Sequence, residues 1–211
     1  MTEQRLGEWY DPKDLREYQD PRPEWLKDRW GRLSDRDILR CLEEEIIKIE
    51  PLSQELPQGL NTCKIDFHLG ELIIYFLRSR LTKIDLTEDI PPQFQEEWSL
   101  SEENPYMLHP GETVLASTYE WLTLPTYIAA RIEGKSRLAR RGLGIQLAAL
   151  IDAGWDGRPT LELHNNGVVP IELKPYVPIG AFSFELLTSP ALFPYGEQHR
   201  SRYKKQDKPR Y

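Results

Sequence analysis

The chain has 211 residues, of which 39% are hydrophobic and 29% are charged, and its net charge at pH 7 is −7. This length suits one domain with an extension, and the acidic balance argues against a protein that binds nucleic acid over its whole surface. A local basic pocket for one triphosphate is still compatible with that balance.

The sequence also argues against a membrane protein and against a zinc-binding protein. No run of residues approaches the ~18 apolar positions of a membrane span, and residues 1–25 lack the apolar centre of a signal peptide. The two cysteines, Cys41 and Cys63, form no C-x-x-C pair and have no histidine pair at zinc spacing. We therefore expect a cytoplasmic protein with no membrane partner, no zinc site and two buried thiols.

Residues 1–31 are polar and broken by proline, yet they carry aromatic residues at Trp9, Tyr10, Tyr18, Trp25 and Trp30. A disordered tail is one interpretation of such a composition. We favour an N-terminal extension that packs on the domain or on a neighbouring subunit, because a free tail has little use for so many aromatic side chains.

Residues 34–47, SDRDILRCLEEEII, predict a helix. Ser34 can cap its first turn, and the acidic residues that follow suit the positive end of the helix dipole. The residues that would share its apolar face are Ile38, Leu39, Leu42 and Ile46. We expect this helix to pack on the outside of the domain without a role in chemistry.

Strand-like segments follow the helix. Residues 64–77 alternate and then become apolar, and shorter runs lie at 112–118, 127–133, 160–165, 169–174 and 181–187. Turn signals containing proline, glycine or asparagine separate them, a texture typical of an antiparallel sandwich or barrel. The G-x-G-x-x-G and P-loop patterns are missing, which argues against a Rossmann or P-loop nucleotide site.

The segment 133–166 is the densest in chemistry. Lys135, Ser136, Arg137, Arg140 and Arg141 gather positive charge and a hydroxyl after a glycine. They suit a phosphate cradle, because arginine offers two-pronged contacts and lysine a point charge. An exposed basic turn would look the same.

Two carboxylates follow. Glu162 lies in TLELHN, where Leu161 and Leu163 should face the core, so that Glu162 and Thr160 face either solvent or a pocket. Asp152 precedes a glycine turn, where it can form the turn or bind a sugar hydroxyl. Residues 199–211 carry six Lys or Arg and one Asp, which fits a solvated tail or a flap that closes over an anionic ligand.

Residues 32–206 resemble the dCTP deaminase family, a branch of the trimeric dUTPase-like superfamily. The motifs that carry the resemblance are LSDRDILRCLEEE, IDFHLG, LHPGE, EGKSRLARRGL, LIDAGW, TLELHNNG, PIG followed by FSFELLTSPA, PYG, and SRYKKQ, in that order. The resemblance implies an all-β fold with a few short helices, a distorted barrel of the β-clip or jelly-roll type, assembled as a homotrimer. It divides the chain into an extension (1–31), the domain (32–198) and a basic tail that closes over the nucleotide (199–211).

The resemblance also assigns roles. Glu162 matches the general acid/base, Ser136 a serine that helps to hold the attacking water, and Lys135 and Arg140 the basic residues at the phosphates and water. Asp152 matches the aspartate near the deoxyribose 3′-hydroxyl. Ala148 belongs to the segment that reads the pyrimidine edge, and the closing residues are Tyr195, Arg202, Tyr203 and Gln206.

The implied activity is the hydrolysis of dCTP to dUTP and ammonia, with Mg²⁺ accompanying the triphosphate and no zinc. One carboxylate can take the proton of water and return it to the ring, whereas zinc deaminases need His and Cys ligands in a defined motif. Alternatives are an enzyme that forms dUMP and pyrophosphate, a dUTPase alone, or a trimer that binds nucleotides without catalysis, with dUTP and dTTP as possible further ligands.

Two departures from the family pattern bear on substrate choice. Arg137 replaces the second of two serines that usually follow the basic residue. The loop 142–152 is one residue shorter than in common versions and carries Gln146 and Leu147.

Overall fold

The computed structural model describes residues 19–52, 59–77, 83–84, 87–88, 90–145, 148–197 and 205–209. Strands dominate this part of the chain, so the predicted all-β class is confirmed. The helices are α1 (Glu24–Lys27), α2 (Asp35–Glu43), the 3₁₀ helix η2 (Pro92–Phe94) and α3 (Ser136–Ala139). The strands are β1 (Gly31–Arg32), β2 (Lys48–Glu50), β3 (Leu60–Asn61), β4 (Lys64–Phe76), β5 (Gln95–Ser99), β6 (Tyr106–Leu108), β7 (Thr113–Thr118), β8 (Trp121–Thr123), β9 (Ile128–Gly134), β10 (Leu143–Gly144), β11 (Leu150–Ile151), β12 (Asp156–Gly157), β13 (Thr160–Asn165), β14 (Ile171–Leu173) and β15 (Pro178–Leu186).

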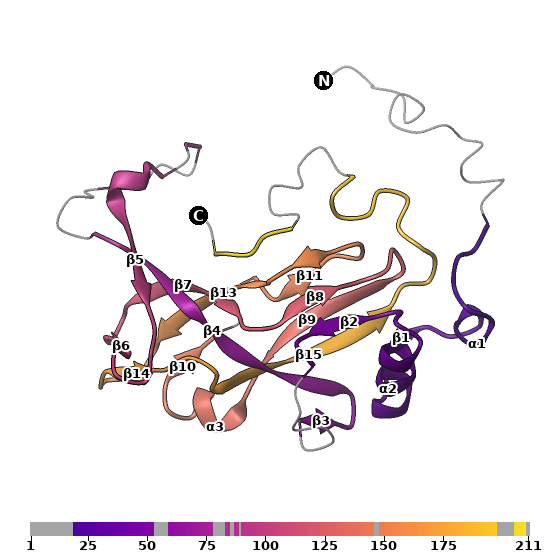
Figure 1. Cartoon of the computed structure of the whole chain (residues 1–211), viewed down its shortest axis with the longest axis horizontal. Coiled ribbons are helices and arrows are strands. Elements are labelled where there is room, and N and C mark those ends of the chain that lie inside the picture. The colour runs from indigo at the N-terminus through magenta and orange to yellow at the C-terminus, as the bar shows by residue number, and fades with distance from the viewer. Residues whose placement is uncertain are drawn as a thin grey trace.

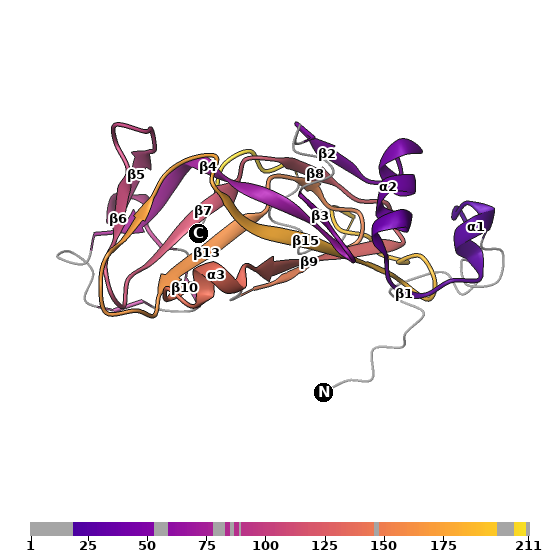
Figure 2. The same ribbon diagram turned by 90° about the horizontal axis from the view of Figure 1, so that it is seen from below.

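The strands form one large antiparallel sheet and two small ones. The large sheet has the order β10-β13-β7-β4-β15-β9-β11, with β1 beside β15 and with β3 and β5 beside β4. The small sheets are β12-β8-β2 and β14-β6. Figure 1 shows the large sheet curling around the interior, and Figure 2 shows α1 and α2 at one end of it and β5 and β6 at the other.

The 13-residue strand β4 produces the curl. Its first half pairs with β15 and its second half with β7 and β5, and the register shifts both beside β15 and between Leu69 and Ile73. Such irregularities bend a strand and increase its twist. Gly70 lies at the bend, where a Cβ would come within 2.8 Å of the Ser117 hydroxyl. One strand therefore serves two differently oriented parts of the sheet.

Apolar side chains from both parts fill the interior. The largest are Phe67, Phe182 and Phe184, all fully buried, and the rings of Phe67 and Phe182 lie 4.5 Å apart. Leu26 of α1 is also fully buried in this core. None of the helices in the described part of the chain is long and apolar enough to cross a membrane.

The predicted helix 34–47 is correct at its start and wrong at its end. Ser34 caps α2 by accepting a hydrogen bond from the Asp37 backbone N–H at 3.3 Å. The helix ends at Glu43, because Glu45 has a left-handed backbone with φ of 52°. Leu39, expected on the apolar face, is 40% exposed, and Cys41 is buried in its place.

The two cysteines differ in burial. Cys41 is fully buried, and burial raises the pKa of its thiol to about 12. Cys63 is only half buried, so the expectation of two buried thiols is wrong for this residue.

Candidate active site

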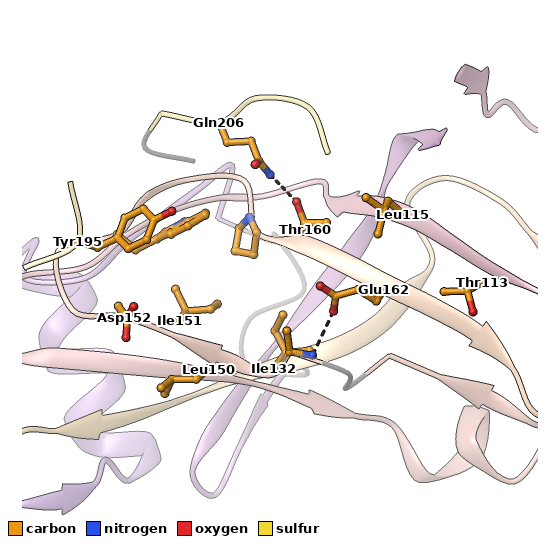
Figure 3. Close-up of a pocket in the computed structure, with 13 residues that line it drawn as sticks. Thr113, Leu115, Ile132, Leu150, Ile151, Asp152, Thr160, Glu162, Tyr195 and Gln206 are labelled. Atoms are coloured by element: carbon orange, nitrogen blue, oxygen red, sulfur yellow. Dashed lines mark hydrogen bonds between the residues drawn. The ribbon is translucent and has the colours of Figure 1, made fainter. Parts of the chain in front are cut away.

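A cavity of about 510 Å³ opens beside β13. Its walls come from β7, β9, β13, the segment from Ala148 to Trp155, and two residues near the end of the chain (Figure 3). The lining residues are Thr113, Leu115, Ile132, Ala148, Leu150, Ile151, Asp152, Trp155, Pro159, Thr160, Glu162, Tyr195 and Gln206. Most of the lining is apolar, and a few polar groups converge on it, as in small-molecule sites.

Strand alternation aims Glu162 into this cavity. Leu161 and Leu163 are both fully buried in the core, and Glu162 between them is half buried on the opposite face. Thr160 lies on the same face as Glu162. The predicted alternation of β13 is confirmed, and the pocket rather than solvent receives the carboxylate.

Two opposing influences act on the Glu162 carboxyl group. Burial raises its pKa because the charged form is poorly solvated, and backbone N–H groups, chiefly that of Ala148, oppose the rise. The Ala148 N–H donates to Glu162 Oε2 at 3.2 Å. A carboxyl with a raised pKa in a cleft is suited to both taking and giving a proton.

The segment around β11 forms the wall opposite β13. The backbone carbonyl of Ala149 accepts a hydrogen bond from Ile132 in β9 at 2.8 Å, which fixes the segment next to Ala148. Asp152 follows β11 and lines the cavity. Its backbone carbonyl accepts from Trp155 N–H at 3.2 Å, so Asp152 is also part of a turn.

Two residues close the cavity from the C-terminal side. The Tyr195 ring packs on Trp155 at 5.0 Å between centroids, and its backbone N–H donates to the carbonyl of Ala153 at 2.8 Å. Gln206 is 2% exposed, and its Nε2 donates to the Thr160 hydroxyl at 2.5 Å. Within the described part of the chain, Gln206 Oε1 is buried without a hydrogen-bond partner.

The basic turn lies apart from this cavity. Lys135 precedes α3, and its ammonium group forms a short ion pair with Asp66 of β4. Ser136 is the first residue of α3 and Arg140 follows its last residue, and both side chains are exposed. Of the predicted phosphate residues, none lines the cavity of its own chain.

The structure therefore brings together half of the predicted site. The residues that meet in the cavity are Ala148, Asp152, Glu162, Tyr195 and Gln206. Three predicted residues do not line the cavity: Lys135, Ser136 and Arg140. The predicted closing residues Arg202 and Tyr203 are not among the residues that the structure describes, and neither are Gln146 and Leu147 of the short loop.

Sequence reasoning assigned no role to several cavity residues. The period of β13 predicted that Thr160 shares the Glu162 face, but not a role for its hydroxyl. Thr113 and Leu115 reach the cavity because β7 pairs with β13, with Leu115 directly opposite Glu162. Strand pairing of this kind leaves no local signal in the sequence.

Sequence comparisons identify the family of the chain. The family described as dCTP deaminase-like matches residues 32–187. A dCTP deaminase from Pasteurella multocida (strain Pm70) is 38% identical over 183 residues, covering 83% of this chain and 93% of its own length. A "dCTP deaminase, dUMP-forming" from Nocardioides sp. (strain ATCC BAA-499 / JS614) is 41% identical over 186 residues, covering 84% of this chain and 92% of its own length.

The fold has a counterpart among solved structures. The 2′-deoxycytidine 5′-triphosphate deaminase from Agrobacterium tumefaciens matches with a TM-score of 0.57 and 22% identity over 74% of this chain. The match spans 48% of that longer chain. This likeness confirms the predicted fold class, and the family match and the curated relatives together show that the chain belongs to the dCTP deaminase-like family.

Proposed function

We propose that the protein catalyses the hydrolytic deamination of dCTP to dUTP and ammonia. The observation that carries the proposal is the half-buried Glu162 carboxyl group, with its raised pKa, facing a cavity of about 510 Å³. Ligand pockets for small molecules have volumes of roughly 300–1,000 Å³, so a nucleotide is of suitable size. The relatives named as dCTP deaminases support this choice of substrate.

The reaction needs one group that moves protons in both directions. Water adds to C4 of cytosine, and Glu162 takes the proton that the water loses. The same carboxyl group delivers that proton to N3, and the tetrahedral carbon then carries a hydroxyl and an amine. Glu162 next takes the proton of this hydroxyl and passes it to the amine, so that the C4–N bond breaks, C4 ends as a carbonyl and ammonia leaves. The Ala148 N–H, 3.2 Å from Glu162 Oε2, holds the carboxylate toward the cavity.

Other cavity residues would hold the nucleotide. Ala148 and Asp152 both line the cavity; the backbone beside Ala148 would read the edge of the base, and Asp152 would bind the deoxyribose 3′-hydroxyl. Tyr195 and Gln206 line the cavity from the C-terminal side. The family resemblance proposes Arg202 and Tyr203, which lie outside the described residues, as further closing residues. Excluding water in this way strengthens every polar contact inside the site.

The triphosphate would be bound by a second subunit of a homotrimer. Ser136 and Arg140 are exposed and lie outside the cavity of their own chain, which suits groups that serve a neighbour. Lys135, held by Asp66, sits at the start of the same turn. In a closed ring of three chains, each subunit can donate this turn to the next one's cavity.

Mg²⁺ would arrive with the triphosphate rather than in a protein-built site. Glu162 and Asp152 are the carboxylates that line the cavity. Across the described ranges, no group of three or more His, Cys, Asp or Glu is arranged to hold a metal ion. Mg²⁺ prefers phosphate and water oxygens with one or two carboxylates, so the bound substrate can supply most of its ligands.

A second candidate is the bifunctional reaction that ends in dUMP and pyrophosphate. The relative from Nocardioides sp. and one from Methanothermobacter thermautotrophicus, the latter 38% identical over 179 residues, are both named dUMP-forming. Arg137 and the short loop 142–152 are the departures from the family pattern that bear on this choice. A trimer that binds dCTP, dUTP or dTTP without catalysis is the remaining alternative.

A nucleotide panel separates these functions. Purified protein is incubated with dCTP, dCMP and dUTP in the presence of Mg²⁺, and ammonia and pyrophosphate are both measured. Ammonia without pyrophosphate from dCTP is expected. Ammonia together with pyrophosphate would favour the bifunctional enzyme, pyrophosphate from dUTP alone would indicate a dUTPase, and binding without either product would indicate a regulator.

A further inference from the structure

The C-terminal segment, residues 205–209, docks on the chain between β12 and β13. The backbone N–H of Lys205 donates to the carbonyl of Asp156 at 2.7 Å, and that of Arg158 donates to the carbonyl of Gln206 at 2.7 Å. The Gln206 side chain returns a hydrogen bond from Nε2 to the Arg158 carbonyl at 3.2 Å. The segment is therefore held by main-chain pairing of the kind that adds a strand to a sheet edge.

Gly157 makes room for this pairing. A Cβ at position 157 would lie 3.0 Å from both the backbone N and the backbone O of Gln206. Backbone atoms cannot move aside as a flexible side chain can. A side chain at this position would therefore force the Gln206 backbone to shift by a few tenths of an ångström, which weakens its pairing with β12.

The Arg158 side chain adds a charged contact to the segment. Its Nε lies 3.1 Å from Asp207 Oδ1 and forms an ion pair with it. In the described part of the chain, this buried Nε–H has no hydrogen-bond partner of good geometry, so the contact is electrostatic. The guanidinium lies over the Tyr119 ring at 5.7 Å, and Tyr119 packs edge-on against Tyr176 at 4.8 Å. These rings restrict where the guanidinium can go.

Arg158 itself does not line the cavity, whereas Gln206 does. Gln206 is 2% exposed and bridges to Thr160, two residues before Glu162. A change at Arg158 can therefore reach the nucleotide site through the segment that it holds.

We propose that Arg158 is a positioning residue, which docks residues 205–209 so that Gln206 closes the cavity beside Glu162. The partners of the segment belong to the chain itself, so docking does not require a nucleotide. Holding the segment in place before binding lowers the ordering cost of closure and so favours substrate binding. This kinetic consequence rests on the proposed function, whereas the docking does not.

A charge-reversal cycle in the full-length protein tests the ion pair. The variants are Arg158→Glu, Asp207→Arg and the double variant, with Arg158→Lys as the conservative change. Arg36→Glu on the exposed face of α2 makes the same change in net charge and serves as the control. Each protein is measured by hydrogen exchange without nucleotide and by dCTP deamination kinetics.

In the wild type, we expect slow exchange at the backbone N–H of Arg158 and of Lys205 without nucleotide. Arg158→Glu should speed exchange at both and raise KM for dCTP by about three- to tenfold, with kcat within about twofold. The double variant should recover both properties at least in part. Arg158→Lys and Arg36→Glu should stay near the wild type.

Fast exchange at both amides in the wild type would overturn the docking. A raised KM in Arg158→Glu that the double variant does not lower would reduce Arg158 to a residue that merely supports the barrel. If Arg158→Glu fails to fold, Gly157→Ala is measured instead, and unchanged exchange there would contradict the proposal. A wild type that releases no ammonia refutes the proposed function, while the exchange data still decide whether the segment docks.

Discussion

The carboxylate of Glu162 and the backbone N–H of Ala148 meet across the cavity at 3.2 Å. The two residues are 14 positions apart, and the contact joins β13 to the start of the segment that carries β11 and Asp152. The carboxylate that we propose as the proton-transfer group is thereby held against the wall that would read the base. We therefore expect a change in the sequence before Ala148 to alter both substrate choice and the orientation of the carboxylate.

Glu162→Gln should abolish ammonia release while leaving nucleotide binding largely intact. Glutamine keeps the shape and can still accept the Ala148 hydrogen bond, but it cannot shuttle a proton. Loss of a general acid/base costs about 10²- to 10⁴-fold in rate. Calorimetry should give a Kd for dCTP within about tenfold of wild type, or roughly 1.4 kcal/mol. Deamination near the wild-type rate would reduce Glu162 to an ordinary strand residue.

The same substitution should stabilise the protein at neutral pH. Burial raises the pKa of Glu162 in the folded chain, so the folded state binds this proton more tightly than the unfolded state does. The free energy of unfolding then falls as pH rises from the unfolded pKa through the folded one. Glutamine does not ionise, so Tm of Glu162→Gln should exceed that of the wild type at pH 7. The advantage should shrink below about pH 4, where the carboxyl is protonated in both states. Equal Tm values at pH 7 would contradict a costly buried carboxylate.

Two inactive variants should restore each other if the site is shared. Glu162→Gln lacks the proton shuttle, and Ser136→Ala lacks a group that we assign to the neighbouring subunit's cavity. After dissociation and reassembly of an equal mixture, about a quarter of the sites would combine an intact Glu162 with an intact Ser136 from the next chain. Ammonia release near that fraction of wild type is expected. A mixture as inactive as its parents would place both residues in one chain's site.

Removal of zinc should not affect deamination. The described residues hold no cluster suited to a metal, and the proposed chemistry uses Glu162 to activate water. Protein washed with a chelator and returned to Mg²⁺ should release ammonia at the untreated rate, with metal content checked by mass spectrometry. Stoichiometric zinc whose removal stops the reaction without unfolding the protein would overturn the mechanism.

Two substitutions of Thr160 test whether its hydroxyl holds the Gln206 side chain over the cavity. Its hydroxyl accepts the Gln206 hydrogen bond at 2.5 Å. Thr160→Val keeps the shape and leaves a buried amide without that partner, at a cost of about 1–3 kcal/mol. We expect KM for dCTP to rise in Thr160→Val and to stay near wild type in Thr160→Ser, which retains the hydroxyl. Equal kinetics in the two variants would show that the hydroxyl does not hold Gln206.

Local patterns predicted those features that depend on a few neighbouring residues. Alternation in TLELHN placed Glu162 opposite two core leucines, and Ser34 was correctly identified as a cap. The helix end was missed because Ile46 and Ile47 continue an apolar pattern, whereas the left-handed backbone at Glu45 has already ended α2. Ile47 is nevertheless buried, so the apolar spacing at this point predicts which residues are buried and not where the helix ends.

Local sequence patterns were sufficient to predict the strand texture, the face of Glu162 on β13 and, through the motifs, the family. Which of these residues meet depends instead on how the strands are arranged in space. Lys135 pairs with Asp66 because β15 lies between β4 and β9, so that Ala181 faces Asp66 on one side and Glu133 on the other. Gln206 reaches Thr160 because the chain returns across β12 after more than 40 residues. Such contacts arise from strand order and chain return, which residue periodicity cannot encode, since a period of two fixes only the face on which a side chain lies.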